Sequence, residues 1–407
     1  MQPISFIPGG VTAAPGFTAS GIHCGIRRNK TKRDLALILA DRPCSAAAVC
    51  TTNIVKAAPI IMTMEHLKDG QAKAILVNSG NANACAPGGM EAAKACVDAA
   101  ASELGISPSD IIVNSTGVIG QPLPTETITG AIPALVAALS RDSDPAAEAI
   151  MTTDTFSKSV AVQCIIGGKT VTIGGIAKGS GMIHPNMATM LAFLTTDCAI
   201  SPEMLKAALQ DSANRTYNRI SVDGDTSTND MTAILASGGA GNPLITKKGT
   251  DEYKVFLEAL NIVNLYLAKK IAKDGEGATK LITCRVGKAV EEETAAALAK
   301  SVISSSLVKS AVFGADANWG RVLCAMGYSG MTFEPTKVDV SFSSKSGQVN
   351  VCKQGIGLDF DEDLAKKVLG CSEITIEISL NEGDETAEAY GCDLTYDYVR
   401  INGDYRT

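Results

Sequence analysis

The chain has 407 residues, of which 45% are hydrophobic, 19% charged and 4% aromatic, with a formal net charge of −7. This length is about two to three times that of a typical domain, so two domains or one large duplicated domain are expected. No cluster of Lys and Arg is interleaved with aromatic residues, which argues against nucleic acid as a partner.

The N-terminal stretch MQPISFIPGGVTAAPGF lacks the features of a signal peptide, and no apolar run reaches the roughly 18 residues of a membrane span. We therefore expect a cytoplasmic protein that binds no membrane. The twelve cysteines include no CxxC pair, so most are expected to be buried free thiols. His23, His66 and His184 lack the spacing of zinc ligands, and no metal site is expected.

Strand and helix patterns alternate along the chain, which predicts a layered α/β (α+β) fold. The predicted strands are 72–80, 110–117, 281–287 and 373–380, and the predicted hairpins are 158–179, turning at Gly167-Gly168, and 337–355. The predicted helices are 90–105, 125–140, one starting at Pro202 with Ser201 as its cap, 251–273, 291–311 and 362–370. The similar make-up of the two halves suggests a duplication, although no repeat of residues is visible.

Three glycine-rich stretches do not match known ligand-binding motifs. Gly168-Lys169-Thr170 has the tail of a P-loop, but Gln163 stands where the first glycine is required. GEGATK from Gly275 lacks the third glycine of a dinucleotide fingerprint. DGDTSTND from Asp223 lacks the glycine and the closing glutamate of an EF-hand. Neither nucleotide nor calcium binding is therefore expected.

The stretch GSGMIHPNMATML places Thr189 between a polar glycine-rich loop and an apolar strand-like segment. A threonine hydroxyl needs a nearby base to act as a nucleophile. Cleavage after Ala188 would supply that base, because the new α-amino group of Thr189 has a reference pKa of about 7.7–8.0. Gly179 and Gly181 would permit the strained approach of Thr189 to the carbonyl of Ala188. The local pattern alone also fits an ordinary β-branched strand residue.

Eight motifs carry a resemblance to a known family: VNSGNANA, NSTGVIG, TTDTFSK, KGSGMIHPNMATML, SVDGDTSTND, DGEGATK, GADANWGR and RINGDYRT. In this order they resemble the ornithine acetyltransferase (glutamate N-acetyltransferase) family of arginine biosynthesis. The motifs extend over nearly the whole chain, which makes the resemblance far more specific than any single motif.

The resemblance implies a two-domain, layered α/β fold of the N-terminal-nucleophile type. It implies that the precursor cuts itself before Thr189 into an α-chain, 1–188, and a β-chain, 189–407, which stay together as an α2β2 assembly. The implied reaction is a ping-pong transfer in which Thr189 takes the acetyl group from N2-acetylornithine and passes it to glutamate, without a cofactor. Whether acetyl-CoA also serves as a donor stays open.

The same resemblance assigns roles to matching positions. Thr116 and Gly117 correspond to the oxyanion hole, although an ordinary glycine turn fits the local pattern equally well. The implied substrate-binding residues are Thr152, Lys178, Thr189, Glu276, Asn402 and Thr407. Lys178 would pair with the α-carboxylate of the amino acid, the alternatives being a surface lysine or a Schiff-base lysine. Glu276 would bind the side-chain ammonium of ornithine, and must shift, protonate or be bridged when glutamate binds.

Two other classes of function stay open. A related self-processing aminopeptidase would use the same nucleophile with water as the acceptor, and would release product without glutamate. A small-molecule binding protein would need no cleavage, and its stability would depend on its ligand.

Overall fold

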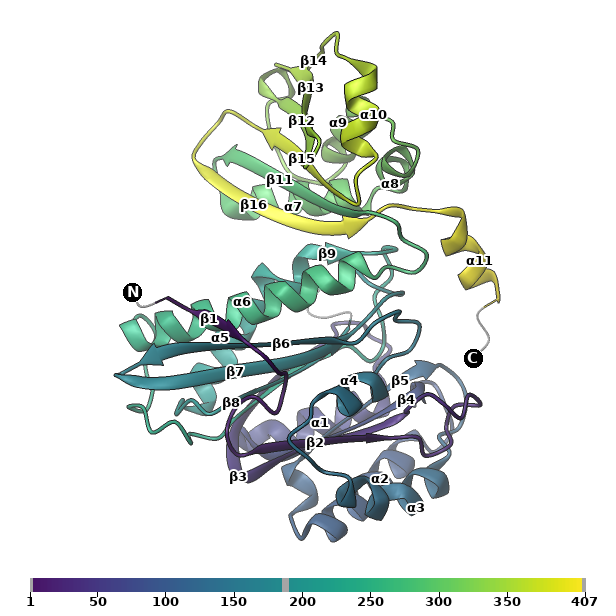
Figure 1. Cartoon of the computed structure of the whole chain (residues 1–407), viewed down its shortest axis with the longest axis vertical. Coiled ribbons are helices and arrows are strands. Elements are labelled where there is room, and N and C mark those ends of the chain that lie inside the picture. The colour runs from purple at the N-terminus through teal and green to yellow at the C-terminus, as the bar shows by residue number, and fades with distance from the viewer. Residues whose placement is uncertain (1–2, 185–189, 405–407) are drawn as a thin grey trace.

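The computed structural model describes residues 3–184 and 190–404. Its described strands form two sheets, one of nine strands and one of seven, with helices packed against them (Figure 1). This mixed arrangement of helices and sheets confirms the predicted α/β fold class.

The larger sheet has the strand order β1-β6-β7-β8-β10-β3-β4-β5, with β2 beside β3. Its strands are β1 (Ser5–Ile7), β2 (Phe17–Ile22), β3 (Leu35–Cys50), β4 (Gln71–Asn81), β5 (Ile111–Val118), β6 (Lys158–Ile166), β7 (Lys169–Lys178), β8 (Leu191–Thr196) and β10 (Met231–Ala236). The first half of β3 pairs with β2 and β4, and its second half pairs with β10. The long strand bends between these two pairings, and the sheet folds over into two layers (Figure 1).

The side chains of β8 and β10 show how the two layers share a core. Phe193 and Leu235 point between the layers and pack in one cluster with Ile38 of β3. Their neighbours Leu194 and Ile234 point the other way, toward helices. This alternation follows from the two-residue period of a strand, and it explains why both strands are buried at every position.

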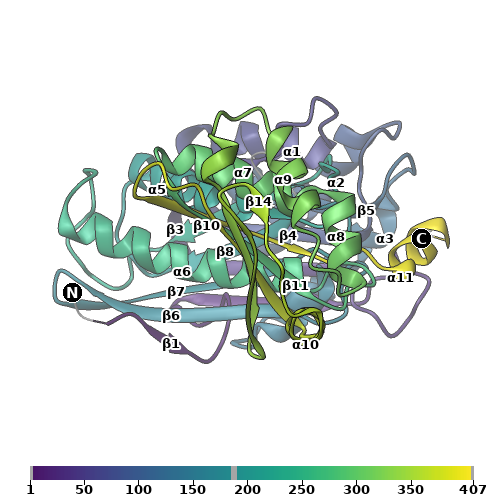
Figure 2. The ribbon, with the colours of Figure 1, turned by 90° about the horizontal axis from the view of Figure 1, so that it is seen from above.

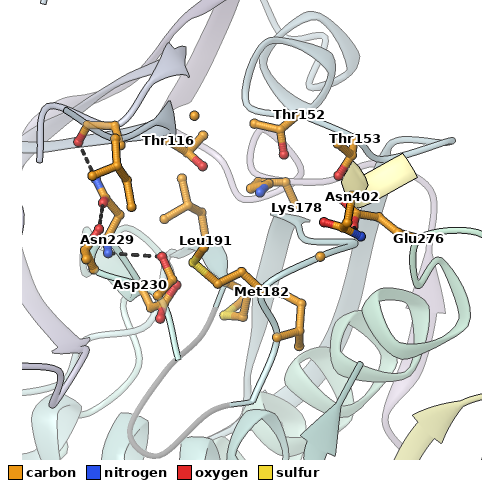
Figure 3. Close-up of a pocket in the computed structure, with 18 residues that line it drawn as sticks. Thr116, Thr152, Thr153, Lys178, Met182, Leu191, Asn229, Asp230, Glu276 and Asn402 are labelled. Carbon is orange, nitrogen blue, oxygen red and sulfur yellow. Dashed lines mark hydrogen bonds between the residues drawn. The ribbon is translucent and has the colours of Figure 1, made fainter. Parts of the chain in front are cut away.

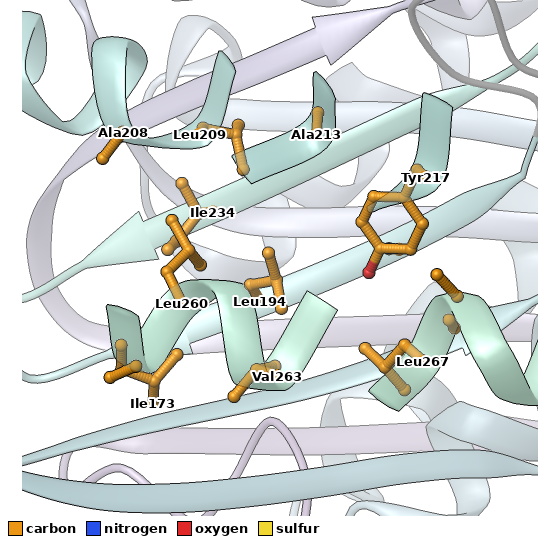
Figure 4. Close-up of a cluster of buried hydrophobic side chains, with 14 of the residues drawn as sticks. Ile173, Leu194, Ala208, Leu209, Ala213, Tyr217, Ile234, Leu260, Val263 and Leu267 are labelled. Atoms are coloured by element: carbon orange, nitrogen blue, oxygen red, sulfur yellow. The ribbon is translucent and has the colours of Figure 1, made fainter. Parts of the chain in front are cut away.

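Helices cover the two outer faces of the folded sheet. The helices of this half are α1 (Ala58–His66), α2 (Gly89–Leu104), α3 (Thr125–Ala137), α4 (Asp144–Ala149), α5 (Pro202–Arg215) and α6 (Asp251–Lys273). α2 and α3 pack on β4 and β5, and α5 and α6 pack on β7, β8 and β10 (Figure 4). Tyr217 is fully buried in the second cluster, where its hydroxyl donates a hydrogen bond of 3.1 Å to Asn264 of α6.

The smaller sheet has the order β14-β13-β12-β15-β11-β16-β9. Its strands are β9 (Ile220–Ser221), β11 (Leu281–Ala289), β12 (Asp339–Ser344), β13 (Gly347–Lys353), β14 (Ile356–Gly357), β15 (Glu373–Ser379) and β16 (Glu385–Cys392). Four helices form a core with it: α7 (Glu292–Ser304), α8 (Ser306–Phe313), α9 (Trp319–Gly327) and α10 (Glu362–Leu369).

Helix α6 joins the two halves of the molecule. Tyr390 and Cys392 of β16 are buried in the same cluster as its apolar side chains, and Lys269 of α6 lies 4.5 Å from the centre of the Tyr390 ring. Seen from above, the smaller sheet lies over α6 and the strands beneath it (Figure 2). The last helix, α11 (Tyr396–Asp404), leaves the smaller sheet and returns toward the larger one (Figure 1).

Several predicted elements are confirmed. The predicted helix 251–273 is α6, and the predicted hairpin 158–179 is formed by β6 and β7. Helix α5 begins at Pro202, and the Ser201 side chain accepts a hydrogen bond of 3.4 Å from the N–H of Met204. Eight of the twelve cysteines are buried, as expected of free thiols that pack in a core.

Two predictions about the second half are wrong. The predicted helix 291–311 is broken at Ser305, which adopts an extended conformation and accepts a hydrogen bond from the N–H of Val308 to cap α8. The suggested duplication is also absent from the described residues, because the two sheets differ in size and strand order.

The predicted chain boundary between 188 and 189 lies outside the described residues, between the adjacent strands β7 and β8. In the described part of the chain, no single helix is long and apolar enough to cross a membrane, and the bent pair α7 and α8 meets that requirement only when both helices are taken together.

Candidate active site

A cavity of about 130 Å³ lies at the edge of the larger sheet where β5 and β7 end and β8 and β10 begin (Figure 3). The strand pairing creates this edge. Lys178, the last residue of β7, pairs with Leu191, the first residue of β8, and Leu191 pairs with Met231, the first residue of β10. The loops that join these strands therefore meet at one place.

Six of the predicted site residues line this cavity: Thr116, Gly117, Thr152, Lys178, Glu276 and Asn402. They come from segments far apart in the sequence, and Figure 3 labels the side chains of all of them except Gly117 around one space. Ala188, Thr189 and Thr407 lie outside the described residues. Met190 also lines the cavity. Thr189 is the residue before Met190 in the sequence.

Gly117 allows two strands to approach each other unusually closely. Its φ is +137°, and a Cβ there would lie 2.3 Å from the carbonyl carbon of Gly80 and 2.5 Å from the amide nitrogen of Asn81. Only glycine fits such a position. The neighbouring Thr116 also lines the cavity.

Lys178 places a buried ammonium group at the cavity wall. It is 7% exposed, and carboxylates of Asp154, Asp230 and Glu276 lie in its surroundings. Burial lowers the pKa of Lys178, while the negative charge of Asp154 acts in the opposite direction. Lys178 can therefore act as the counter-ion of a carboxylate that enters the cavity.

Asp154 holds in place the part of the cavity wall that contains Thr152 and Lys178. Its carboxylate accepts hydrogen bonds from the N–H of Thr152 (2.9 Å), the N–H of Gly179 (2.7 Å) and the ammonium of Lys158 (2.8 Å). Burial alone would raise the pKa of Asp154, but the charges of Lys158 and Lys178 and these hydrogen bonds bring it to about 2. The carboxylate is thus ionised and holds two segments of the site in place.

The ion pair extends to the turn that carries Glu276. Lys158 Nζ lies 2.6 Å from Asp274, and both side chains are buried. Asp274 also accepts a hydrogen bond from the N–H of Thr155, and its carbonyl accepts one from Ser180. Lys158 therefore binds the carboxylates of Asp154 and Asp274, and these contacts connect the loop after α4, the end of β7 and the end of α6.

Glu276 faces the cavity from this turn. Its Oε2 accepts a hydrogen bond of 2.8 Å from the side-chain amide of Asn402 on α11. Gly181 makes room for the carboxylate, because a Cβ there would lie 2.3 Å from Cδ of Glu276. Glycine is required at positions 179 and 181 for different reasons. Gly179 has a φ of +156°, whereas Gly181 leaves space for the side chain of Glu276.

The segment 221–231 is hydrogen-bonded to the chain before residue 185 and after residue 189. Asp223 accepts hydrogen bonds from the N–H groups of Met182 (2.6 Å) and Ile183 (2.8 Å), and Thr226 donates one to the carbonyl of His184 (2.9 Å). On the other side, the N–H of Met231 donates to the carbonyl of Met190 (2.9 Å). The stretch DGDTSTND, which does not match an EF-hand, therefore holds the residues that precede the predicted cleavage segment.

Asn229 and Asp230 complete the cavity wall. Asn229 donates hydrogen bonds to the carbonyls of Ala82 (2.6 Å) and Ser115 (2.8 Å), and so connects the start of β10 to the end of β5, where a turn was predicted. Oδ2 of Asp230 is buried without a hydrogen-bond partner in the described part of the chain. Burial raises the pKa of Asp230 well above its usual range, although Lys178 opposes this.

Sequence reasoning missed Asp154, Asn229 and Asp230 as members of the site. A signal for them was present, because Asp154 lies in TTDTFSK and the other two end SVDGDTSTND. These motifs contributed to the resemblance, but the individual residues received no role.

Comparison with known proteins identifies the family. The sequence profile of the ArgJ family matches residues 18–407. The chain belongs to the ArgJ family. This confirms the predicted family, and with it the prediction of an acetyl-transferring enzyme of arginine biosynthesis.

Two relatives of similar length support the assignment to the ArgJ family, and one solved structure is similar to part of the chain. The arginine biosynthesis bifunctional protein ArgJ of Symbiobacterium thermophilum is 51% identical over 407 residues, which cover 99% of this chain and 100% of the relative. ArgJ 1 of Clostridium acetobutylicum is 50% identical over 399 residues, covering 98% and 97%. The solved ornithine acetyltransferase of Mycobacterium tuberculosis, complexed with ornithine, is 36% identical with a TM-score of 0.43, and the match covers 46% of this chain and 100% of that chain.

Proposed function

We propose that this ArgJ-family enzyme transfers an acetyl group from N2-acetylornithine to glutamate through an acetyl ester on Thr189. The products are ornithine and N-acetylglutamate. One observation carries the proposal: six residues from distant segments, each assigned a site role by its motif, line a single cavity next to Met190. Thr189 is the residue before Met190 in the sequence, and we propose that its hydroxyl and α-amino groups act in that cavity.

The polar groups of the cavity suit the charges of the substrates. Lys178 is a buried cation for the α-carboxylate that both N2-acetylornithine and glutamate carry. Glu276, oriented by Asn402, suits the side-chain ammonium of ornithine. The Thr116 hydroxyl and the Gly117 N–H lie near the end of β5, and these groups would stabilise the tetrahedral oxyanion, where one donor typically contributes about 10²–10³ in rate.

As the first residue of its chain, Thr189 would supply both the nucleophile and the base of the reaction. After cleavage between Ala188 and Thr189, the α-amino group of Thr189 accepts the proton of its own hydroxyl as the oxygen attacks the acetyl carbonyl. That proton then goes to the departing amine of ornithine. The same steps run in reverse with the amine of glutamate as the attacking group. We propose that 1–188 and 189–407 remain associated as an α2β2 assembly.

The first experiment is an intact mass measurement under denaturing conditions. Wild type should yield two fragments that meet at Ala188 and Thr189, whereas Thr189→Ala should stay one chain. Thr189→Ser serves as the matched control, because it keeps the hydroxyl and should still be cleaved. Incubation with N2-acetylornithine without glutamate should make the fragment that begins at Thr189 one acetyl group heavier.

An exchange assay then tests the ping-pong order. Labelled ornithine should enter N2-acetylornithine in the absence of glutamate, because the acetyl ester forms before the acceptor binds. An uncleaved wild-type chain that still transferred acetyl would falsify the proposed nucleophile. Release of free acetate at the same rate with and without glutamate would favour a hydrolase.

A further inference from the structure

Three titratable side chains line the active-site cavity in the part of the chain that the structure describes: Lys178, Asp230 and Glu276. Two of them match charged groups of the substrates, since Lys178 suits the α-carboxylate and Glu276 suits the side-chain ammonium of ornithine. Asp230 has no role in these contacts, although it is only 3% exposed and a buried carboxyl group is costly without a partner. Asp230 is therefore the titratable group of the cavity whose purpose is open.

The backbone around Asp230 is fixed on two sides. The N–H of the next residue, Met231, donates a hydrogen bond of 2.9 Å to the carbonyl of Met190, just before β8. The preceding residue, Asn229, donates a hydrogen bond to the carbonyl of Ser115 in β5. Asp230 thus lies between the start of β8 and the strand end that carries the predicted oxyanion hole.

The side chain of Asp230 has one oxygen to offer to a ligand. Its Oδ2 is buried and has no hydrogen-bond partner among the described residues. Buried polar atoms normally have a partner, so one is expected from outside these residues, and a substrate in the cavity can supply it. Figure 3 shows Asp230 at the end of the cavity away from Glu276 and Asn402. Asp230 therefore faces a different part of the substrate from the ammonium that Glu276 would bind.

The surroundings of Asp230 favour a carboxyl group that holds its proton. Burial raises the pKa of Asp230 well above its usual range, while Lys178 and hydrogen bonds from Ser227 act in the opposite direction. Cys50, which faces Asp230 from the end of β3, has a pKa raised to about 12 by burial and by the charge of Asp230. The Cys50 thiol therefore keeps its own proton. A carboxyl group with a raised pKa is suited to exchanging a proton near neutral pH.

The transfer of an acetyl group between two amino acids needs such an exchange in each half of the reaction. In the first half, the hydroxyl proton of Thr189 makes the nitrogen of ornithine a neutral amine, and one more proton makes it an ammonium. In the second half, glutamate arrives as an ammonium, which cannot attack the acetyl ester until it loses a proton. The α-amino group of Thr189 carries the hydroxyl proton, so this second proton needs another carrier.

We propose that Asp230 is a catalytic residue that exchanges this second proton with the reacting nitrogen of both substrates. The inference rests on the proposed function and deepens it. Both amino acids carry their α-carboxylate on the same carbon as this nitrogen. A carboxylate bound by Lys178 therefore brings the nitrogen toward the acidic groups around Lys178, and Asp230 is one of them.

The proton balance closes over one cycle. In the first half, the neutral carboxyl of Asp230 gives its proton to the departing amine of ornithine, which leaves as an ammonium, and Asp230 becomes a carboxylate. In the second half, this carboxylate takes a proton from the ammonium of glutamate. The neutral amine then attacks the acetyl ester, the C–N bond forms as the C–O bond breaks, and the remaining N–H proton restores the hydroxyl of Thr189.

The test follows the loss of the acetyl group from the acetyl enzyme by intact mass. Wild type, Asp230→Asn and Asp225→Asn are acetylated with N2-acetylornithine, separated from ornithine, and mixed with glutamate or with hydroxylamine. Hydroxylamine is the matched nucleophile, because its amine is already neutral at neutral pH and needs no base. Asp225 is the matched control residue, because it is exposed in the same loop and does not line the cavity.

Asp230→Asn should lose its acetyl group to glutamate about 10²-fold more slowly than wild type at neutral pH, the typical effect of removing a general base. With hydroxylamine the two rates should agree within about twofold. The rate of Asp230→Asn with glutamate should rise about tenfold per pH unit, because only the free amine attacks, whereas that of wild type should rise much less. Asp225→Asn should match wild type with both nucleophiles.

The outcomes separate this inference from the proposed function. Equal slowing of Asp230→Asn with both nucleophiles, or a pH dependence with glutamate like that of wild type, overturns the inference. If Asp230→Asn does not fold or is not cut, wild type and Asp230→Glu decide instead. A rate with glutamate that follows the free amine in either of them also overturns it. A wild-type enzyme that forms no acetyl ester from N2-acetylornithine refutes the proposed function itself.

Discussion

Replacing Asp154 by asparagine should weaken both the fold and the site. The change removes the negative charge that Lys158 contacts at 2.8 Å and leaves Lys178 with one fewer opposing charge. It also places an amide N–H₂ group where a carboxylate oxygen accepted a hydrogen bond, so that at least one donor faces another donor. All of this happens in a site whose Asp154 and Lys158 side chains have no exposed surface.

The size of the effect can be estimated from these contacts. Removing one partner of a buried ion pair typically costs about 3–5 kcal/mol, and we expect about 4 kcal/mol for Asp154→Asn. Asp98→Asn is the matched control, because Asp98 forms an exposed pair with Lys94 one turn away on α2. Loss of such a surface pair costs about 0.3–0.5 kcal/mol.

The pH dependence of stability gives a second estimate for the same group. The pKa of Asp154 is about 2 in the folded protein against an ordinary value of 3.8. A lowered folded-state pKa means that the stabilisation is fully present above about pH 4 and is lost as the pH falls toward 2. The difference corresponds to about 2 kcal/mol. Asp154→Asn should lack this part of the acid transition.

Urea unfolding at pH 7 and an acid titration of both variants and wild type provide the measurements. Kinetics with N2-acetylornithine should show a lower kcat for Asp154→Asn, since Thr152 and Gly179 lose their common acceptor. A loss of stability no larger than that of Asp98→Asn would show that Asp154 does not hold the site together.

Three further predictions concern the substrate cavity. Gly181→Ala should displace the Glu276 carboxylate, 2.3 Å from the new Cβ, and lower kcat/KM for N2-acetylornithine roughly 30–100-fold, whereas a merely flexible loop would tolerate alanine. Because burial lowers the pKa of Lys178, its ammonium loses its proton as the pH rises, before the ordinary lysine value of 10.5 is reached. The kcat/KM for transfer should therefore fall on the alkaline side of the pH profile, and Lys178→Arg should move this fall to higher pH. A chain ending at Asp404 should lose activity without a comparable loss of thermal stability, and wild-type kinetics would exclude Thr407 from the site.

Local patterns predicted the elements whose structure depends on nearby residues. The helix 251–273 has a continuous apolar stripe and a threonine cap, and the hairpin of β6 and β7 has two glycines at its turn. Strand β10 was missed, because both faces of MTAILA are buried and its composition shows no alternation. The bend of β3 was also not predictable, since it depends on pairing with strands far away in the sequence.

The site was predictable only as a set of motifs. The resemblance placed Thr116, Lys178 and Glu276 at one site, and the cavity that contains them depends on how distant strands end at one edge. The cluster of Asp154, Lys158 and Asp274 connects residues more than 100 positions apart, so no local pattern could indicate it.

Strand β8 is hydrogen-bonded to β7 on one side and to β10 on the other. Under the proposed cleavage, the break falls between β7 and β8, and the new chain end begins a central strand of the larger sheet. The two polypeptides could then separate only by opening that sheet, and unfolding would release two molecules in place of one. The unfolding midpoint of the cut protein should therefore rise more steeply with protein concentration than that of the uncut Thr189→Ala chain, because its unfolding releases more molecules.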